Sequence, residues 1–492
     1  MRGVVAAGHP VTAEAGAQVL RTGGNAVDAA LAAMLMSFVA EPQLTGLGAG
    51  GYMLVAPPGE PALLLDFFVE APGRGADPAA RSPLVPIDVW FEDAVQTFHV
   101  GAAACGVYGT PAGICEAHRR FGTVALPDLV APAAALARAG VEINAQQAYI
   151  FKLLEPITAT TPEARAKYWC GDRVGRAGDR LRDPELASAL ERLGNEGEEP
   201  FYRGDIAVAV CERMAAQGGA ITPADLAGYR VAARGPVEVG YRGHEVLTNP
   251  PLSAGGILIA YVLAALDRKP GPPTLARVLE AMRDAHLQRT PEFLEGLARP
   301  GFLDEFLGSQ LGSTTHISAL DADGLACAVT CTNGEGSGIV VPGTGIHLNN
   351  MMGEEDLSPQ GFFTHPPGRR LPSMMAPTVV RRGGEVQLVL GSAGSNRIRS
   401  AILQVILGVI DHGLDLETAV EAPRAHWEGG VVYLEPGIEE TAVATLDHPL
   451  VHFRELNIFF GGVQAVGRDP ATRELAGAGD PRRGGAAVVV GA

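Results

Sequence analysis

The sequence lacks an excess of positive charge, because its 492 residues include 38 lysines and arginines against 55 aspartates and glutamates. The formal net charge of −17 argues against nucleic acid and anionic membranes as partners, since both attract basic surfaces. A long hydrophobic run is also missing: residues 29–40 form the longest one. That run falls well short of the roughly 20 residues that a membrane-spanning helix needs. We therefore expect no nucleic-acid partner and no membrane partner.

Cysteine is scarce as well, with six in the whole chain. This is too few for a disulfide framework and indicates a reducing compartment. Cys327 and Cys331 have a spacing that a metal pair could use, but no histidine cluster completes such a site. We predict that both are small buried hydrophobic side chains, with no metal site and no cofactor. The glycine-rich residues 46–51 have no P-loop lysine after them, which favours a tight turn over a nucleotide loop.

Hydrophobic residues make up 47% of the chain, enough for a large core, and the length would fit two or three average domains. Apolar spacing and capping residues predict helices, with Thr12 and Asn25 as the N-caps of the first two. The segment 171–199 is charged and is predicted to be a surface loop. The predicted helices cover residues 12–21, 26–40, 127–140, 206–218, 257–266 and 397–411, and the predicted strands lie at 52–55, within 60–110, within 236–249 and around 377–391.

Residues 313–350 contain the pattern that the rest of the chain is predicted to support. Residues 321–324, Asp-Ala-Asp-Gly, have turn chemistry and separate two apolar runs, which predicts a β-hairpin. If Leu320 pairs with Leu325, Thr332 lies opposite Ser313 and beside Thr314. A hairpin of this kind brings two hydroxyl groups to one end, as a nucleophile and its hydrogen-bonding partner would require.

A hydroxyl is a poor nucleophile at neutral pH unless a base accepts its proton. An N-terminal threonine can use its own α-amine as that base, because an α-amine titrates at about 7.7–8.0. Thr314 is internal, so the peptide bond between Ser313 and Thr314 would first have to be cut. The two adjacent threonines are also explained by ordinary β-propensity at the start of a strand.

Several motifs in order resemble the γ-glutamyltransferase (γ-glutamyltranspeptidase) family. The segment TTHISALDADG…TNGEGSGIVVPGTGIHLNN is similar to the start of that family's small subunit, and the segment at 8–55 is similar to its opening. Shorter matches are YGTPAG at 108–113, NPPLSAGG at 249–256, LPSMMAPT at 371–378, GSAGSNRI at 391–398 and AGDPRRGGAA near the end. The likeness covers most of the chain.

This resemblance implies an α+β fold, the four-layer αββα sandwich of the N-terminal-nucleophile hydrolases. It implies one structural domain made of two segments, 1–313 and 314–492, that remain together as a heterodimer after self-cleavage, with a dimer of these as an option. Secreted members carry a targeting segment before the first motif. The chain begins MRGVVAAGHP and passes directly to that motif, so a cytoplasmic protein is expected.

The resemblance also assigns roles to individual residues. Thr314 matches the nucleophile, and Thr332 matches the threonine whose hydroxyl supports it. Gly394 and Ser395 fall where backbone N–H groups form the oxyanion hole, although the second position is usually glycine. Asn333 follows Thr332 directly, one place earlier than the family's asparagine, and Glu335 lies nearby. Both are candidates for holding substrate, with polar turn residues as the alternative.

The substrate end departs from the family pattern. Phe68 stands where true γ-glutamyltransferases have the arginine that binds the glutamyl α-carboxylate, and losing such a clamp is a large chemical change. Of the two assisting serines only Ser373 remains, and Glu354, or else Glu355, approximates the aspartate that binds the α-amine. Arg74, Arg370 and Arg397 are candidate replacement cations, with structural arginines as the alternative. The lid loop is reduced to residues 358–370.

Two functions are compatible with this pattern. The first is a self-processing amide hydrolase or acyltransferase that passes its acyl group to water, an amine or a peptide. Its donor would be a γ-glutamyl compound such as glutathione, or another acyl amide, for example of the glutaryl type. The second is a non-catalytic scaffold that has lost substrate binding. The presence of Thr314, Thr332 and Gly394 favours the enzyme.

Overall fold

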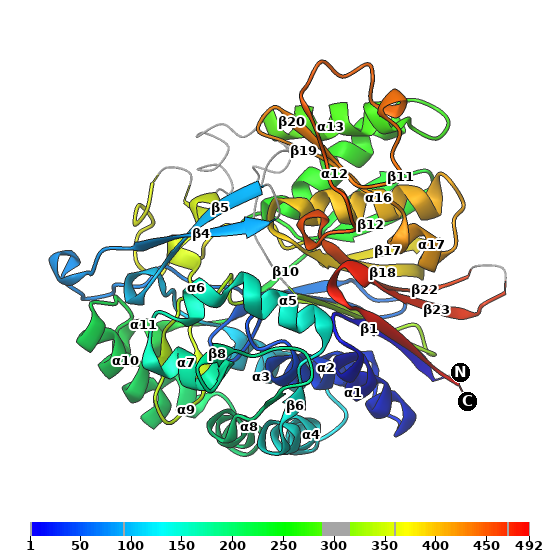
Figure 1. The fold of residues 1–492 in the computed structure, drawn as a ribbon. Coiled ribbons are helices and arrows are strands. Elements are labelled where there is room, and N and C mark those ends of the chain that lie inside the picture. The colour runs from blue at the N-terminus through cyan, green and yellow to red at the C-terminus, as the bar shows by residue number, and fades with distance from the viewer. Residues whose placement is uncertain (1, 92–93, 288–314, 359–360, 470–471, 492) are drawn as a thin grey trace.

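The computed structural model describes residues 2–91, 94–287, 315–358, 361–469 and 472–491. Ser313 and Thr314, and therefore the proposed cleavage point, lie outside these residues. Two antiparallel β-sheets pack face to face, and helices cover the outer face of each (Figure 1). This is the predicted αββα sandwich.

The first sheet has seven strands, and its order in space differs from its order in the sequence. From one edge to the other the strands are β10 (Ala232–Arg234), β3 (Leu63–Phe67), β2 (Gly50–Ala56), β14 (Ala326–Thr332), β13 (Thr315–Asp321), β1 (Gly3–Ala7) and β24 (Ala486–Val490). Because β1 pairs with β24, the first and last strands of the chain lie side by side (Figure 1).

The second sheet packs on the first through the contacts of β18 and β22 with β13 and β14. Its six strands, in spatial order, are β11 (Val237–Tyr241), β12 (His244–Thr248), β17 (Thr378–Arg382), β18 (Glu385–Ala393), β22 (Gly462–Arg468) and β23 (Leu475–Gly479). Both sheets contain strands from before and after residues 313–314, so the two segments share one pair of sheets.

Short strands outside these sheets form small ribbons. These are β4 (Val85–Phe91) with β5 (Ala94–Val100), β6 (Val141–Glu142) with β9 (Arg180–Leu181), β7 (Trp169–Cys170) with β8 (Arg173–Val174), β15 (Val340–Val341) with β16 (Ile346–His347), and β19 (Ala425–Glu428) with β20 (Val431–Leu434) and β21 (Leu450–His452). The β4–β5 hairpin matters most for function, because β5 lines the pocket described below.

Helices on the first sheet are contributed by the N-terminal half of the chain. They are α1 (Pro10–Arg21), α2 (Ala26–Ala40), α3 (Thr110–Phe121), α4 (Leu126–Ala139), α5 (Ala145–Leu153), α6 (Glu155–Thr158), α7 (Pro162–Tyr168), α8 (Pro184–Glu196), α9 (Glu199–Tyr202), α10 (Asp205–Gln217) and α11 (Pro223–Gly228), some packed on the sheet and others on its helices. The second sheet is covered by α12 (Ala254–Asp267), α16 (Ile398–Ile410) and α17 (Leu416–Glu421), with α13 (Leu275–Leu287) packed on α12.

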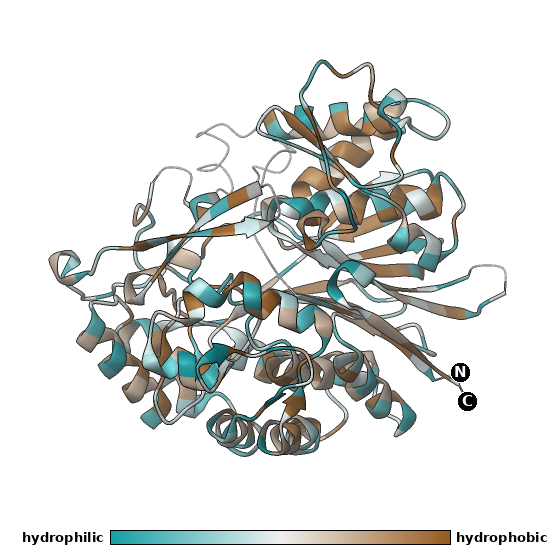
Figure 2. Cartoon of the chain, viewed as in Figure 1, coloured by the Kyte–Doolittle hydropathy of each residue, from teal (hydrophilic) through white to brown (hydrophobic). Residues whose placement is uncertain are grey.

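The sequence explains why α2 is buried between α1, α4 and the first sheet. It is apolar on nearly every side, and all of its residues are buried. As predicted, Asn25 caps the helix, and Asp28 completes a capping box with it. Figure 2 shows the same hydrophobic character along α12, whereas α10 on the outside of the molecule mixes hydrophilic and hydrophobic turns.

The predicted N-cap of α1, Thr12, was wrong, because the helix begins earlier in the sequence. The N-cap is His9, whose side chain accepts a hydrogen bond from the Val11 N–H, and Pro10 occupies the first helical position. Thr12 is instead inside the helix, where its hydroxyl donates to the Glu41 carboxylate at 3.0 Å. The hydroxyl that resembles a cap therefore makes a tertiary contact.

The segment 171–199 was predicted to be a loop, but it contains the helix α8. Asp183 caps that helix by accepting from the Leu186 N–H, and Leu186, Leu190 and Leu193 form its buried face. The charged residues that suggested a loop lie on the other face. The amphipathic spacing was the better signal.

The hairpin of β13 and β14 forms as predicted, with its register shifted by one residue. Leu320 pairs with Ala326, and Thr315 pairs with Cys331. Leu325 belongs to the turn, because its N–H donates to the Asp321 side chain and its carbonyl accepts from the Asp321 N–H. Thr332 therefore lies one residue beyond the partner of Thr315.

All six cysteines are free thiols. Within the described ranges, no group of three or more histidine, cysteine, aspartate or glutamate side chains could hold a metal ion. Among the helices that the structure describes, none combines the length and apolar character needed to cross a bilayer.

Candidate active site

The last residues of two strands meet where the sheets pack together. Strand β14 ends at Thr332, and β18, which packs on β14, is followed by Gly394. A small pocket at this place is lined by Gly334, Glu335, Gly394, Arg397 and Arg483, together with Leu44, Gln96, Ile150, Leu153, Leu154 and Ile458. The fold thus brings the predicted residues Glu335 and Gly394 into one pocket.

Thr332 is buried at the end of β14, and its hydroxyl oxygen accepts a hydrogen bond from the Gly334 N–H at 2.7 Å. Across the hairpin, the Thr315 hydroxyl donates to the Glu41 carboxylate at 2.9 Å. Burial raises the pKa of Glu41, while the hydrogen bonds from Thr315 and Thr12 lower it. The described start of β13 is therefore fixed by a buried carboxyl group.

The turn after Thr332 is also closely packed. Asn333 is fully buried, and neither polar atom of its side chain has a hydrogen-bond partner within the described part of the chain. The Glu335 N–H donates to the Asn350 side-chain oxygen, and the backbone N–H of Asn350 donates to the Asn333 carbonyl. Gly334 has a φ of 65°, and a side chain there would collide with Asn350 and Glu354. The orphaned amide of Asn333 is consistent with a substrate contact.

Gly394 and Ser395 lie at the N-terminal end of α16, where helical N–H groups favour negative charge. Gly394 has a φ of 117°, and a β-carbon there would lie 2.6 Å from the Gly461 α-carbon. Ser395 also has a positive φ, 56°, which is costly for a residue other than glycine. Two consecutive residues in this left-handed conformation therefore separate the end of β18 from α16.

We predict that Ser395→Gly is more stable than Ser395→Ala by about 1–2 kcal/mol, because glycine adopts the left-handed conformation without strain. Both variants lose the hydroxyl group, so the difference between their free energies of unfolding reports the effect of the backbone conformation alone. Urea unfolding of the two proteins measures it. Equal stabilities, or a more stable alanine variant, would show that this backbone is not strained.

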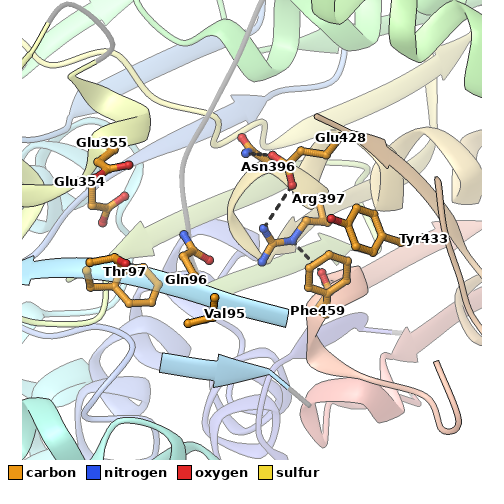
Figure 3. Close-up of a pocket in the computed structure, with 11 residues that line it drawn as sticks. Val95, Gln96, Thr97, Glu354, Glu355, Asn396, Arg397, Glu428, Tyr433 and Phe459 are labelled. Carbon is orange, nitrogen blue, oxygen red and sulfur yellow. Dashed lines mark hydrogen bonds and ion pairs between the residues drawn. The ribbon is translucent and has the colours of Figure 1, made fainter. Parts of the chain in front are cut away.

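A second pocket adjoins the first, since Gln96 and Arg397 line both. Its volume is about 310 Å³, and the β5 residues Val95, Gln96, Thr97 and Phe98 form one wall. Figure 3 shows Glu354 and Glu355 on one side and the group of Asn396, Arg397 and Glu428 on the other. Glu354, predicted to bind substrate, therefore lies in this larger pocket.

Arg397 is held in place by several partners. Its Nε donates to the Phe459 carbonyl at 2.8 Å, its guanidinium lies over the Phe459 ring, and it is 3.8 Å from Glu428 (Figure 3). Burial raises the pKa of Glu428, but His426 and Arg397 outweigh it and lower that pKa to about 2. Burial lowers the pKa of His426 to about 4. Glu428 is thus an anion that partly neutralises Arg397.

Besides the buried Asn333, two predicted substrate-binding residues, Phe68 and Ser373, line neither pocket. Phe68 is buried against Tyr52, with ring centroids 5.5 Å apart, and its carbonyl accepts from the Tyr229 hydroxyl. Ser373 is buried in a turn, where its hydroxyl accepts from the Met375 N–H and its carbonyl accepts from the Ser253 hydroxyl. Both have structural contacts in the core.

Two of the three candidate replacement cations, Arg370 and Arg74, form ion pairs with acidic residues outside the two pockets. Arg370 lies 3.3 Å from Asp66 and 3.7 Å from Glu70. Arg74 lies 3.3 Å from Glu70 and 3.6 Å from Asp225. Arg397 alone of the three lines the pockets, and it already faces Glu428.

Three residues at this place were not singled out from the sequence. Glu41 follows an apolar helix and could have been found as a carboxylate next to a buried segment. Asn350 is the last residue of the segment 313–350, and the pair of consecutive asparagines at its end could have indicated a polar site. Arg483 belongs to the quoted motif AGDPRRGGAA, but its position in the pocket depends on the fold.

Known proteins of one family resemble this chain over nearly its whole length. The family model for gamma-glutamyltranspeptidase matches residues 12–490. The chain is 32% identical to the acylase ACY 1 proenzyme of Pseudomonas sp. (strain SE83), covering 95% of this chain and 90% of that protein. It is also 32% identical to the glutathione hydrolase proenzyme of Escherichia coli (strain K12), covering 98% and 90%. The crystal structure of cephalosporin acylase from Bacillus halodurans superimposes with a TM-score of 0.85 and 26% identity, covering 100% of this chain and 96% of that one.

Proposed function

Because the chain belongs to the gamma-glutamyltranspeptidase family of N-terminal-nucleophile hydrolases, we propose that Thr314 is its nucleophile, released by self-cleavage after Ser313. The observation that carries this proposal is that Gly334 and Glu335, which follow β14, line one pocket with Gly394, which precedes α16. Thr315, the residue after the proposed nucleophile, pairs with Cys331, the neighbour of Thr332. The buried Thr332 hydroxyl would then support the nucleophile.

The proposed reaction uses the new α-amine of Thr314 as its base. The amine accepts the hydroxyl proton as the threonine oxygen bonds to the carbonyl carbon of an amide. The N–H groups of Gly394 and Ser395 then donate to the resulting oxyanion. When the carbon–nitrogen bond breaks, the proton passes from the α-amine to the leaving amine, and an ester remains on Thr314. Water or an amine acceptor releases the acyl group by the same steps in reverse.

The donor class is the finer part of the proposal. γ-Glutamyl compounds such as glutathione are the first candidate, since one relative is named a glutathione hydrolase. Another acyl amide is the second candidate, since a different relative is named an acylase and Phe68 stands in place of the carboxylate-binding arginine. Hydrolysis of a panel of acyl anilides, with γ-glutamyl and non-glutamyl members, distinguishes the two.

Self-cleavage has its own test. Intact-mass measurement of the purified protein is expected to give two fragments, one ending at Ser313 and the other beginning at Thr314. The mature protein should then turn over at least one acyl anilide. A chain that stays uncut after long incubation would support a non-catalytic scaffold instead.

A further inference from the structure

The β4–β5 hairpin lies beside the candidate active site and has one buried face. That face belongs to a small apolar cluster with residues from α5 and α6, made up of Val89, Phe98, Val100, Ile150, Leu154, Ile157 and Ile458. Leu154 and Ile458 also line the small pocket that contains Gly394. Apolar packing therefore holds the hairpin next to the proposed oxyanion hole.

The other face of the hairpin carries two exposed apolar side chains, Trp90 and Val95. They are direct partners in the antiparallel ladder, so both side chains project from the same face, with β-carbons about 5 Å apart. Trp90 is 63% exposed and Val95 is 51% exposed. The next pair on that face is polar, because the Thr97 hydroxyl donates to the Asp88 carboxylate at 2.6 Å. We call the two apolar residues the Trp90–Val95 patch.

The larger pocket borders this patch, because Val95 is one of its lining residues. Phe459 and Tyr433 line the same pocket, with ring centroids 4.9 Å apart (Figure 3). The pocket volume is about 310 Å³. Since an apolar cavity of about 150 Å³ holds benzene, this pocket has room for an aromatic or alkyl group beside Val95.

The two pockets are continuous at Gln96 and Arg397, which line both. The small pocket contains Gly394, so the reacting carbonyl and its acyl group belong there. In the proposed reaction the acyl group stays on the enzyme as an ester while one amine departs and another molecule enters. The amine portion therefore needs a position that reaches solvent without displacing the acyl group. The larger pocket meets this requirement, because the half-exposed Val95 forms part of its wall.

We propose that the larger pocket and the Trp90–Val95 patch bind the amine portion of the substrate, which makes the preferred donors amides of aromatic or alkyl amines. This inference rests on the function proposed above and names the class of its leaving group. An aromatic or alkyl group placed on Val95 and Trp90 removes exposed apolar surface from water, and that burial favours binding. A strongly hydrophilic amine gains nothing from the same surface.

The kinetic test keeps the acyl group constant and changes the amine. For the acyl group that the anilide panel identifies, the p-nitroanilide is compared with the N-acylglycine in the wild type, Trp90→Ser and Val95→Ser. Each variant is expected to lose about five- to tenfold in kcat/KM on the anilide, as for the loss of about 50 Å² of apolar contact. Because glycine has no apolar group for the patch, kcat/KM on the N-acylglycine should change less than about twofold.

Val85→Ser is the matched control, because it makes the same change on the same hairpin. Val85 is 48% exposed, pairs with Val100 at the other end of the ladder and lines neither pocket. Its kinetics should equal those of the wild type on both substrates. Equal losses on the anilide and the N-acylglycine in Val95→Ser would overturn the proposal, since the residue would then act on the hairpin or on the reaction itself. Unchanged kinetics on the anilide in both patch variants would also overturn it.

A binding measurement separates this inference from the proposed function. Ligand-observed NMR titration of the purified protein with p-nitroaniline should show binding that Trp90→Ser and Val95→Ser weaken about five- to tenfold. Val85→Ser should leave this binding unchanged, and glycine should not reproduce it. If the protein neither cleaves itself nor hydrolyses any anilide but binds p-nitroaniline in this way, the enzymatic proposal fails and the amine site stands. If it cleaves itself and turns over anilides, but neither rates nor binding depend on the patch, the amine site fails alone.

Discussion

Thr314→Ala is expected to leave the chain uncut and to abolish turnover of every acyl donor. The variant lacks the hydroxyl that attacks both the preceding peptide bond and the substrate, and removal of a catalytic nucleophile costs several powers of ten in rate. We expect the loss to reach at least about 10⁴-fold in kcat. Intact mass reports the cleavage, and hydrolysis of the donors that the wild type accepts reports turnover.

Thr314→Ser is the matched control, because serine keeps a hydroxyl group at the same position. It should cleave itself and hydrolyse donors, at a reduced rate. The assignment of the nucleophile is wrong if the alanine variant hydrolyses a donor at a rate near that of the wild type. It is also wrong if the alanine variant produces the fragment that begins at residue 314.

Arg482→Met is expected to cause the largest loss of stability among these variants, about 3–5 kcal/mol in the free energy of unfolding. Arg482 and Glu435 are both buried, and the substitution leaves the Glu435 carboxylate there without its guanidinium partner. Asp480 keeps a contact with Arg424 at 2.6 Å, so it is the less affected of the two acids. Breaking one side of a buried pair is costly because the other charge stays desolvated.

This stability should be measured in the uncut Thr314→Ala background, where unfolding involves a single chain. Urea unfolding of the Arg482→Met and Arg483→Met variants then gives a matched comparison of adjacent arginines. We expect the free energy of unfolding of Arg483→Met to be within about 1 kcal/mol of its parent's. No hydrogen-bond partner is lost with that side chain, whose buried Nε has none in the described part of the chain. Similar losses in both variants would mean that Arg483 is also a structural residue.

The fold was accessible from the sequence because long elements have strong local signals. The buried α2 followed from its apolar composition and from Asn25, and the β13–β14 hairpin followed from the turn residues 321–324. The shifted register could not be foreseen, since it depends on Asp321 drawing Leu325 into the turn. Hydrogen bonds of this kind have no periodic signature.

Only part of the candidate site could be predicted from the sequence, because some of its residues are brought there by tertiary packing. Gly394, Glu335 and Glu354 were recognised from motifs, and the structure places them in adjoining pockets. Phe68 and Ser373 were assigned by alignment, but their side chains have contacts in the core. Glu41 and Arg483 reach the site from distant parts of the chain, so only tertiary packing reveals them.

The interleaved sheets have a consequence for how the mature molecule can be made. In the first sheet, β13 and β14 of the later segment lie between β1 and β2 of the earlier one. A nick before residue 314 would therefore change the number of chains without loosening the assembly. Reassembly from separated pieces would depend on protein concentration, whereas refolding of the intact precursor would not. Maturation of this kind would therefore be irreversible for each molecule.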